Sequence, residues 1–419
     1  MSDACAKLGH PERTFPIVHV AGTNGKGSTS AMLERVLREH GLRTGLYTSP
    51  HLARFAERIQ LDGEPLEDDA FAEALAVAGS PQLGEPSLFE ALTLAAFVTF
   101  AKAAVDVAVL EVGLGGRLDA TNVVPPPLAC AVTSIGLDHT RLLGPDHASI
   151  AYEKASIAKP GTPLVVGPLP EDAVEATRRT ALAREAGPIL WVAESDETPV
   201  PEGAPRCYMT FVNGSTCDRS HATVTMPDGV SYRLEPRLDG RHQQVNAAIA
   251  ASVAHQLQPR FHGIERSIEP GIAAARWPGR LETLALSGRE VLLDCAHNAE
   301  GVATLVRSLD GRPPERTLLV YGAVEDKPWE PMLRALAPRA TRRHYCRPLE
   351  PIAGRRSVEP ARLAERYPGQ THASPEAAVT AALAGAEPGE LVVVTGSIFL
   401  VGAARALLLG FERDPVVPM

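Results

Sequence analysis

The sequence predicts an α/β protein: a large domain on a mostly parallel sheet, with a β-hairpin insertion, followed by a smaller Rossmann-like α/β domain. Two observations lead to this prediction. Short apolar runs typical of strands alternate with helical stretches along most of the chain, which is the βαβ pattern of parallel sheets. Between about Arg206 and Leu234 this pattern gives way to polar–apolar alternation around Asn-Gly and Asp-Gly, which indicates hairpins.

The elements of the first domain are expected in the following order. "PIVHVAG" is a strand, and the helix "STSAMLERVLREHG", starting near Ser28, follows it. "TGLYTS", "VDVAVLEVG", "LACAVTSIG" and "TPLVVG" are further strands, and "GRHQQVNAAIAASVAHQL" is a helix. "ALTLAAFVTFA" is broken by Lys102, well short of the ~20 residues that a bilayer requires, so we expect a buried helix there and no membrane span.

The boundary between the domains is expected at Leu281–Gly288, at the end of "ARWPGRLETLALSGRE", where proline and glycine come together. The first domain then covers residues 1–282 and the second covers residues 289–419. In the second domain, "VLLDCAHN", "TLLVYGA" and "LVVVTGS" are expected strands flanked by helical segments.

Composition excludes several classes of function. The 419-residue chain has a formal net charge of −9, whereas proteins that bind nucleic acid or anionic membranes need basic surface. The first twenty residues lack the charged and apolar regions of a secretory signal. The six cysteines are scattered without CxxC spacing, which fits neither a zinc site nor a disulfide framework. We therefore expect a cytoplasmic protein.

The stretch "HVAGTNGKGSTS" has the composition and context of a phosphate-binding loop between a strand and a helix. Backbone N–H groups of the loop and the helix N-terminus would face an anion. Lys26 would reach the β- and γ-phosphates of ATP, and the hydroxyl of Ser28 or Thr29 would ligate Mg²⁺. The spacing departs from the common pattern, so a glycine-rich turn with an exposed lysine is the alternative. The candidate ATP-binding residues of the loop are Asn24, Gly25, Lys26, Gly27 and Ser28.

Three residues near the ends of expected strands are candidate metal ligands: Ser49, Glu111 and His139. In a parallel sheet the carboxyl ends of neighbouring strands meet at one edge, where ligands bind. A carboxylate such as Glu111 suits Mg²⁺, whereas a histidine there is more often a loop or core residue and a serine is more often a helix cap. Lys154 has apolar helix neighbours and could face the interior, although the sequence alone favours a surface lysine.

A set of motifs, taken together, resembles the folylpolyglutamate synthase / dihydrofolate synthase family of the Mur ligase superfamily. They follow the family order from about Leu8 almost to the C-terminus. The motifs are "HVAGTNGKGST", "YTSPHL", "LFEALT", "LEVGLGGRLDATN", "TSIGLDHTRLLG", "YEKASIAKPG", "GRHQQVNAAIA", "RWPGRLE", "LDCAHN" and "VVTGS".

The resemblance implies a monomeric, ATP-dependent ligase that joins L-glutamate to a folate carboxylate, or to dihydropteroate, through an acyl phosphate. It also implies two Mg²⁺ ions, one held by Ser28 and Glu111 and the other by Ser49, Glu111 and His139. Lys154 matches a family lysine that is carbamylated. The implied nucleotide-binding residues are Asn246, Arg280 and Asp294. His297, as a catalytic residue, and Ser397 are placed on the glutamate side. The implied pterin-pocket residues are Phe89, Glu90, Leu118, Asp119 and Ala120.

Several alternatives stay open at this point. The chain could be another Mur-type ligase, a P-loop NTPase or phosphotransferase, or a non-catalytic ATP-binding module. Phe89 could stack on a pterin or simply pack in the core. Only a few residues precede Leu8, where relatives usually carry a segment that helps to enclose the pterin. Either the true start lies upstream or the dihydropteroate pocket is less complete. Because "LFEALT" and "GRLDATN" are retained, we expect both activities, with dihydrofolate synthesis the more vulnerable, and folylpolyglutamate synthesis alone as the alternative.

Overall fold

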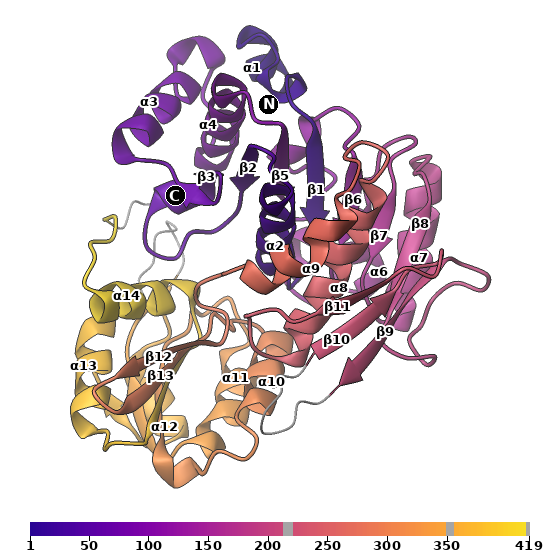
Figure 1. Cartoon of the computed structure of the whole chain (residues 1–419). Helices are drawn as coiled ribbons and strands as arrows, with labels where there is room; N and C mark the ends of the chain where they lie inside the picture. The colour runs from indigo at the N-terminus through magenta and orange to yellow at the C-terminus, as the bar shows by residue number, and fades with distance from the viewer. Residues whose placement is uncertain (213–220, 349–355, 416–419) are drawn as a thin grey trace. The chain divides into compact units, whose positions relative to one another are not determined.

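The computed structural model describes residues 1–212, 221–348 and 356–415, and the chain folds into two compact units (Figure 1). Unit 1 contains Met1–His51, Ala56–Arg237 and Arg241–Trp277. Unit 2 contains Leu52–Phe55, Leu238–Gly240 and the chain from Pro278 onward. Each unit has its own sheet, so the expected α/β class with two sheets is confirmed.

Unit 1 is built on an eleven-stranded sheet with the order β11-β10-β9-β8-β7-β6-β1-β5-β2-β3-β4. Its middle is parallel, because β1 pairs in parallel with both β5 and β6, and β5 pairs in parallel with β2. The strands outside the insertion are β1 (Ile17–Ala21), β2 (Thr44–Tyr47), β3 (Ile59–Leu61), β4 (Glu64–Pro65), β5 (Val107–Glu111), β6 (Ala129–Val132), β7 (Leu164–Val166) and β8 (Ile189–Ala193).

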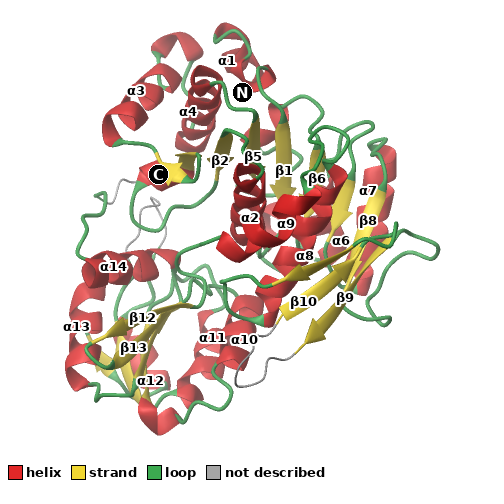
Figure 2. Cartoon of the chain, viewed as in Figure 1, coloured by secondary structure: helices red, strands yellow, loops and turns green. Residues whose placement is uncertain are grey.

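All residues of the central strands β1, β5 and β6 are buried, as expected for parallel strands covered on both faces. Residues of α6 and α7 share an apolar cluster with residues of β6 and β7. Helices α2, α8 and α9 lie against one another (Figure 2). The helices of unit 1 are α1 (Ser2–Lys7), α2 (Lys26–Glu39), α3 (Asp68–Ala78), α4 (Leu88–Ala103), α5 (Thr140–Leu143), α6 (His147–Ala155), α7 (Glu171–Ala183), α8 (Arg241–Gln256) and α9 (Glu265–Ala274).

The expected hairpin insertion is confirmed. Strands β9 (Arg206–Val212), β10 (His221–Thr225) and β11 (Ser231–Leu234) pair antiparallel, and β9 joins β8 in parallel, so the insertion extends the main sheet. The Asp228-Gly229 turn lies between β10 and β11, with Gly229 at a φ of 90°. The expected Asn213-Gly214 turn lies outside the described residues.

Unit 2 is built on a six-stranded sheet with the order β12-β13-β17-β14-β15-β16, which is parallel except for the β12–β13 pair. Apolar clusters that include alternate residues of β13 and β17 form its core. The strands are β12 (Glu282–Leu286), β13 (Arg289–Leu293), β14 (Thr317–Tyr321), β15 (Arg342–Tyr345), β16 (Gln370–Thr371) and β17 (Leu391–Thr395). The helices are α10 (Ala299–Ser308), α11 (Trp329–Leu336), α12 (Pro360–Arg366), α13 (Pro375–Gly385) and α14 (Ile398–Leu409).

The segment expected to separate the domains contains a strand. Within Leu281–Gly288 the structure has β12, which pairs antiparallel with β13 across the tight turn at Ser287 and Gly288. Both turn residues have positive φ, of 49° and 79°. The sequence did not predict this strand, because β12 is a short edge strand whose residues alternate between half-buried and exposed.

Two further expectations concern helices and cysteines. Helix α4 covers the apolar run that was expected to be a buried helix, and most of its residues are buried. In the described part of the chain, no helix combines the length and apolar character needed to cross a bilayer. The five cysteines in this part are buried and free, and Cys217 lies outside it.

Candidate active site

The phosphate loop joins the end of β1 to α2, which begins at Lys26, two residues earlier than expected. Gly25 caps the helix with a φ of 85°, a left-handed conformation that favours glycine. A Cβ atom on Gly25 would collide with Oδ1 of Asn246, which comes from α8. The structure thus brings the predicted nucleotide-binding residue Asn246 directly against the loop.

The segment that follows β6 holds the loop in place through hydrogen bonds. The Thr23 N–H donates to the Ser134 carbonyl (2.8 Å), and the Asn24 N–H donates to Ser134 Oγ (2.9 Å). The Thr133 hydroxyl donates to the Asn24 carbonyl (2.7 Å). Sequence reasoning missed Thr133 and Ser134, and the available signal was a pair of hydroxyl residues where a buried strand ends. These bonds fix the backbone of the loop at Thr23 and Asn24.

Lys26, Glu111 and Ser49 lie together where adjacent strands end. Lys26 Nζ donates to the Thr23 carbonyl (3.3 Å) and lies 3.9 Å from Glu111 Oε1. Glu111 is the last residue of β5 and is only 4% exposed. The Ser49 backbone N–H donates to Glu111 Oε2 at 3.2 Å. A buried carboxylate is therefore paired with the lysine of the phosphate loop.

Lys154 points into the protein, contrary to the surface position that the sequence alone favoured. It lies on α6, is 5% exposed, and its Nζ donates a 2.8 Å hydrogen bond to the Gly22 carbonyl. Burial, together with the nearby positive charge of Lys26, lowers the pKa of Lys154 to about 7. A substantial fraction of this amine is therefore unprotonated at neutral pH.

The residues at the loop fit a magnesium ion bound together with phosphate. Mg²⁺ prefers oxygen ligands and is usually held by one or two carboxylates plus substrate phosphates. Glu111 supplies a buried carboxylate, and Ser28 and Thr29 supply buried hydroxyls in the first turn of α2. Within residues 1–212, 221–348 and 356–415, no three His, Cys, Asp or Glu side chains gather into a metal-binding group. Phosphate oxygens and water would complete the coordination of an ion held there.

His139 lies directly before the short helix α5. It is the N-cap residue of α5, has a φ of 52°, and its side chain is 37% exposed. Its Nε2 atom lies 4.0 Å from Asp138 Oδ1. Its place in a second metal site stays a prediction.

Two predicted pterin-pocket residues, Phe89 and Glu90, lie in the first turn of α4. The Phe89 ring covers Gly113 so closely that a Cβ atom there would collide with it, and it lies 6.1 Å from the Tyr47 ring. The Glu90 carboxylate accepts from the backbone N–H of Ser87 (2.9 Å), and the Ser87 hydroxyl caps the helix in return. Glu90 therefore has a structural role that the sequence analysis did not assign.

The other three candidates lie at the end of the loop that follows Glu111. Leu118 is 79% exposed, whereas Asp119 and Ala120 are buried. Burial raises the pKa of Asp119, and hydrogen bonds from Thr121 and from backbone N–H groups act in the opposite direction. The loop thus presents two exposed leucines, Leu114 and Leu118, and Leu118 is followed by a carboxylate that accepts hydrogen bonds from within the loop region on both oxygens.

In unit 2 the candidates Asp294, His297 and Ser397 follow the neighbouring parallel strands β13 and β17. Asp294 accepts backbone N–H groups from Leu281 (3.0 Å) and from Ala296 (3.0 Å). Burial raises its pKa, against the opposing effect of the Arg280 charge. His297 Nδ1 lies 2.8 Å from the Cys295 carbonyl, and Ser397 is the N-cap residue of α14. These three residues of unit 2 therefore follow the ends of two neighbouring strands.

A buried arginine close to Glu111 was also missed. Arg58 is 3% exposed, its Nε donates to His51 Nδ1 (3.0 Å), and its charge interacts with that of Glu111. Burial, reinforced by the Arg58 charge, lowers the pKa of His51 to about 3, so the imidazole is neutral and can accept this hydrogen bond. A buried cation thus lies in the electrostatic environment of the proposed metal ligand.

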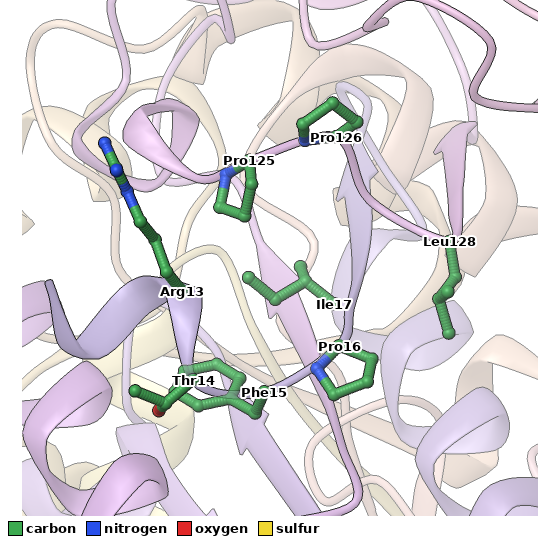
Figure 3. A pocket seen from close by; sticks show the side chains of 8 residues that line it. All are labelled: Arg13, Thr14, Phe15, Pro16, Ile17, Pro125, Pro126 and Leu128. Atoms are coloured by element: carbon green, nitrogen blue, oxygen red, sulfur yellow. The ribbon is translucent and has the colours of Figure 1, made fainter.

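A separate cavity of about 320 Å³ lies at the other end of the unit 1 sheet (Figure 3). Phe15, Pro16 and Ile17 line one side, at the start of β1, and Pro125, Pro126 and Leu128 line another, just before β6. The phosphate loop follows the carboxyl end of β1. This cavity is therefore distinct from the candidate active site.

Comparisons with known proteins identify the family. The Mur ligase middle domain matches residues 20–254, and the glutamate ligase domain of Mur ligases matches residues 279–398. The dihydrofolate synthase/folylpolyglutamate synthase of Escherichia coli is 36% identical over 405 residues, which are 96% of this chain and 88% of that protein. A solved structure of E. coli FolC in complex with DHPP and ADP has a TM-score of 0.83 and 32% identity, covering 98% of this chain and 92% of the other.

One relative is much longer than this chain. The probable bifunctional folylpolyglutamate synthase/dihydropteroate synthase of Haloferax volcanii is 36% identical over 95% of this chain, but the match spans only 46% of that protein. The chain therefore spans about half the length of this relative. The match to the family model over residues 20–254 and the near full-length similarity to the E. coli protein lead to one conclusion: the chain belongs to the Mur ligase family, among the relatives named folylpolyglutamate synthase/dihydrofolate synthase.

Proposed function

We propose that this protein is an ATP-dependent ligase that joins L-glutamate to the carboxylate of a folate, through an acyl phosphate. The observation that carries the proposal is the convergence of Lys26, Glu111, Ser49 and Lys154 around one phosphate loop. A carboxylate resists attack by an amine because it is negatively charged and has no good leaving group. Transfer of the γ-phosphoryl group of ATP to the carboxylate removes both obstacles, which is why a phosphate loop suits a ligase.

Each residue of this cluster has a proposed role. Lys26 and the loop N–H groups stabilise charge on the transferring phosphoryl group. Ser28 and Glu111 would hold one Mg²⁺ ion, and Ser49, Glu111 and His139 would hold a second. When bound, Mg²⁺ neutralises charge on the phosphate oxygens. The partly neutral Lys154 amine would be carbamylated, which replaces a buried cation with an anion suited to supporting the metals.

The remaining assignments follow the family resemblance. Residues 1–282 form the ATP-binding domain and residues 289–419 the glutamate-ligase domain, an assignment supported by the two domain matches. The enzyme acts as a cytoplasmic monomer. The nucleotide-contacting residues are Asn24–Ser28, Asn246, Arg280 and Asp294. On the glutamate side, His297 would act in catalysis and Ser397 would bind substrate. The pterin-pocket residues are Phe89, Glu90, Leu118, Asp119 and Ala120.

Both tetrahydrofolate and dihydropteroate are proposed acceptors. The motifs that contain the pterin-pocket candidates, "LFEALT" and "GRLDATN", are intact. The similar E. coli protein is named dihydrofolate synthase/folylpolyglutamate synthase. The similar solved structure of E. coli FolC is a complex with DHPP and ADP. Dihydropteroate and tetrahydrofolate share the pterin end, so one pocket can serve both reactions.

The decisive experiment measures ADP release and glutamate incorporation with each acceptor. We expect ADP release to require L-glutamate and either tetrahydrofolate or dihydropteroate, with a glutamylated product detected by mass spectrometry. Release of ADP that is independent of glutamate would instead indicate an NTPase or phosphotransferase. Product from tetrahydrofolate alone would restrict the function to folylpolyglutamate synthesis.

A further inference from the structure

A buried chain of hydrogen bonds links the strand that precedes the phosphate loop to the loop that follows Glu111. His19, in the middle of β1, lies 2.8 Å through Nε2 from the hydroxyl oxygen of Thr121. That hydroxyl donates to Asp119 Oδ1 at 2.6 Å. His19 and Thr121 are both 0% exposed, and Asp119 is 9% exposed. The three side chains therefore interact without competition from bulk water.

The chemistry of the three side chains determines which of them donates in each hydrogen bond. Asp119 accepts backbone N–H groups on both oxygens, from Thr121 on Oδ1 (3.0 Å) and from Leu114 on Oδ2 (2.9 Å), so these donors stabilise an ionised carboxylate. The Thr121 hydroxyl gives its one proton to this carboxylate and must accept from His19. Nε2 of His19 then carries the imidazole proton. Nδ1 has no hydrogen-bond partner among the residues that the structure describes. A buried N–H group without a partner costs more than a buried nitrogen without a proton, so this also places the proton on Nε2.

The Asp119 carboxylate, at the end of this series of hydrogen bonds, closes the loop between Gly113 and Leu118. The bond from the Leu114 N–H to Asp119 joins the start of the loop to the residue just after it. A second anchor lies near the end of the loop, where the Arg117 N–H donates to the Glu153 carbonyl of α6 at 2.9 Å. Leu114 and Leu118 are exposed, and Leu118 lies between Arg117 and Asp119. Release of Asp119 would free the loop start while the α6 anchor remained.

We propose that His19 and Thr121 are positioning residues for folate binding, which hold the Asp119 carboxylate so that the Gly113–Leu118 loop keeps the shape that receives the folate. The inference rests on the proposed function. His19 and Thr121 act through Asp119 and have no role in phosphoryl transfer. Their loss should therefore weaken binding of the folate and leave the handling of ATP unchanged.

Substitutions at Thr121 give the cleanest test, because Thr121→Val removes the hydroxyl and keeps the shape, while Thr121→Ser keeps the hydroxyl. His19→Gln retains an N–H donor at a similar reach, and His19→Leu removes it. Thr177→Val is a matched control. Thr177 is also 0% exposed, and its hydroxyl has no hydrogen-bond partner among the described residues.

Steady-state kinetics of the full chain is the first readout. We expect Thr121→Val to raise KM for tetrahydrofolate by about tenfold or more, because the loop loses a hydrogen bond to the charged carboxylate that holds it, while kcat and KM for ATP change less than about twofold. Thr121→Ser and Thr177→Val should resemble the unsubstituted protein. An unchanged KM for tetrahydrofolate in Thr121→Val would overturn the proposal. Equal losses in Thr121→Val and Thr121→Ser, or an equal rise in KM for ATP, would also overturn it.

Amide hydrogen exchange of the ligand-free protein is the second readout, and it does not depend on activity. We expect faster exchange over residues 112–119 in Thr121→Val and His19→Leu than in their conservative counterparts, with residues 22–28 unchanged. If His19→Leu does not fold, the Thr121 pair decides the result. Uniformly faster exchange along the chain would mean general destabilisation and would overturn the proposal. A lack of glutamate ligation by the unsubstituted protein would count against the proposed function. The exchange data would still test whether His19 and Thr121 hold the Gly113–Leu118 loop through Asp119.

Discussion

The side chain of Lys154 donates a 2.8 Å hydrogen bond to the carbonyl of Gly22, so α6 and the first residue of the phosphate loop are joined by a buried amine. Gly22 and Lys154 are 132 positions apart in the chain. The Lys26 charge contributes to the lowered pKa of Lys154, which places the amine within the electrostatic field of the loop lysine. This relationship makes Lys154 a testable part of the site.

Lys154→Ala is expected to be inactive, and short carboxylic acids such as acetate are expected to restore part of its turnover. The reason is that a small carboxylate can occupy the place of the carbamate that we propose. Lys159→Ala is the matched control, because Lys159 lies nearby and donates to the Asn122 carbonyl (2.9 Å), outside the loop. If no acid restores turnover, and bicarbonate depletion does not change the turnover of the unsubstituted protein, the proposed carbamylation of Lys154 is wrong.

The lowered pKa of Lys154 also predicts a pH dependence of stability. Its folded-state pKa is about 7, below the ordinary value of 10.5, so between these values the unfolded chain binds more protons and stability rises with pH. Below pH 7 the cost of burying the charged amine is present in full. In CO₂-free buffer, the gain in stability of Lys154→Met over the unsubstituted protein should be largest below pH 7 and shrink towards pH 10. Denaturant melts across this range measure it, and a gain that is constant with pH would contradict the prediction.

Lys26→Ala is expected to abolish phosphoryl transfer and leave the fold intact. Removal of a donor to developing charge typically costs ~3 kcal/mol or more in the barrier, which is at least about a hundredfold in kcat. Lys102→Ala is the control, because its exposed ion pair with Glu73 lies on the surface. The test compares kcat and the melting temperature of both variants. Activity of Lys26→Ala within a few-fold of the unsubstituted protein would remove the loop from the mechanism.

Gly25→Ala is expected to impair ATP binding, whereas Gly41→Ala is expected to leave ATP binding unchanged. Both glycines have nearly the same φ, 85° and 89°, so both substitutions carry a similar backbone strain of about 1 kcal/mol. Only at Gly25 would the new methyl group collide with another residue, Asn246, whereas Gly41 has open space. We therefore expect a raised KM for ATP in Gly25→Ala alone. Equal kinetics in the two variants would show that contact with Asn246 is unimportant.

Ser87→Ala is expected to lower the free energy of unfolding by about 1 kcal/mol, because it removes the cap of α4 and the hydroxyl partner of Glu90. Glu90→Gln keeps an acceptor for the Ser87 N–H but removes the charge, so its effect on KM for the folate tests the proposed substrate role separately. Denaturant melts measure the first effect and kinetics measures the second. A Ser87→Ala protein as stable as the unsubstituted one would mean that the capping box is not significant for the helix.

Local pattern was enough to predict several parts of the protein. The strand before Gly22 and the helix after Gly25 follow from an apolar run, glycines that accept unusual φ, and an amphipathic stretch. Glu111 was predicted at the end of a strand because the apolar run before it stops there, and the chain pairing confirms β5 beside β1. Hydrophobic periodicity and turn residues act over a few positions, so they can be read without knowledge of the fold. Edge strand β12, with its half-buried alternation, shows where this signal becomes too weak.

The sequence by itself therefore determined the fold class, the phosphate loop and the family, whereas only the tertiary structure decided which side chains meet. Apolar neighbours showed that Lys154 could face inward, but not that it would reach Gly22. Nothing in the local pattern links His19 to Thr121, 102 positions away, or Thr133 to the Asn24 carbonyl, 109 positions away. A helix or strand pattern fixes the face on which a side chain lies, and the packing of distant elements then supplies its hydrogen-bond partner.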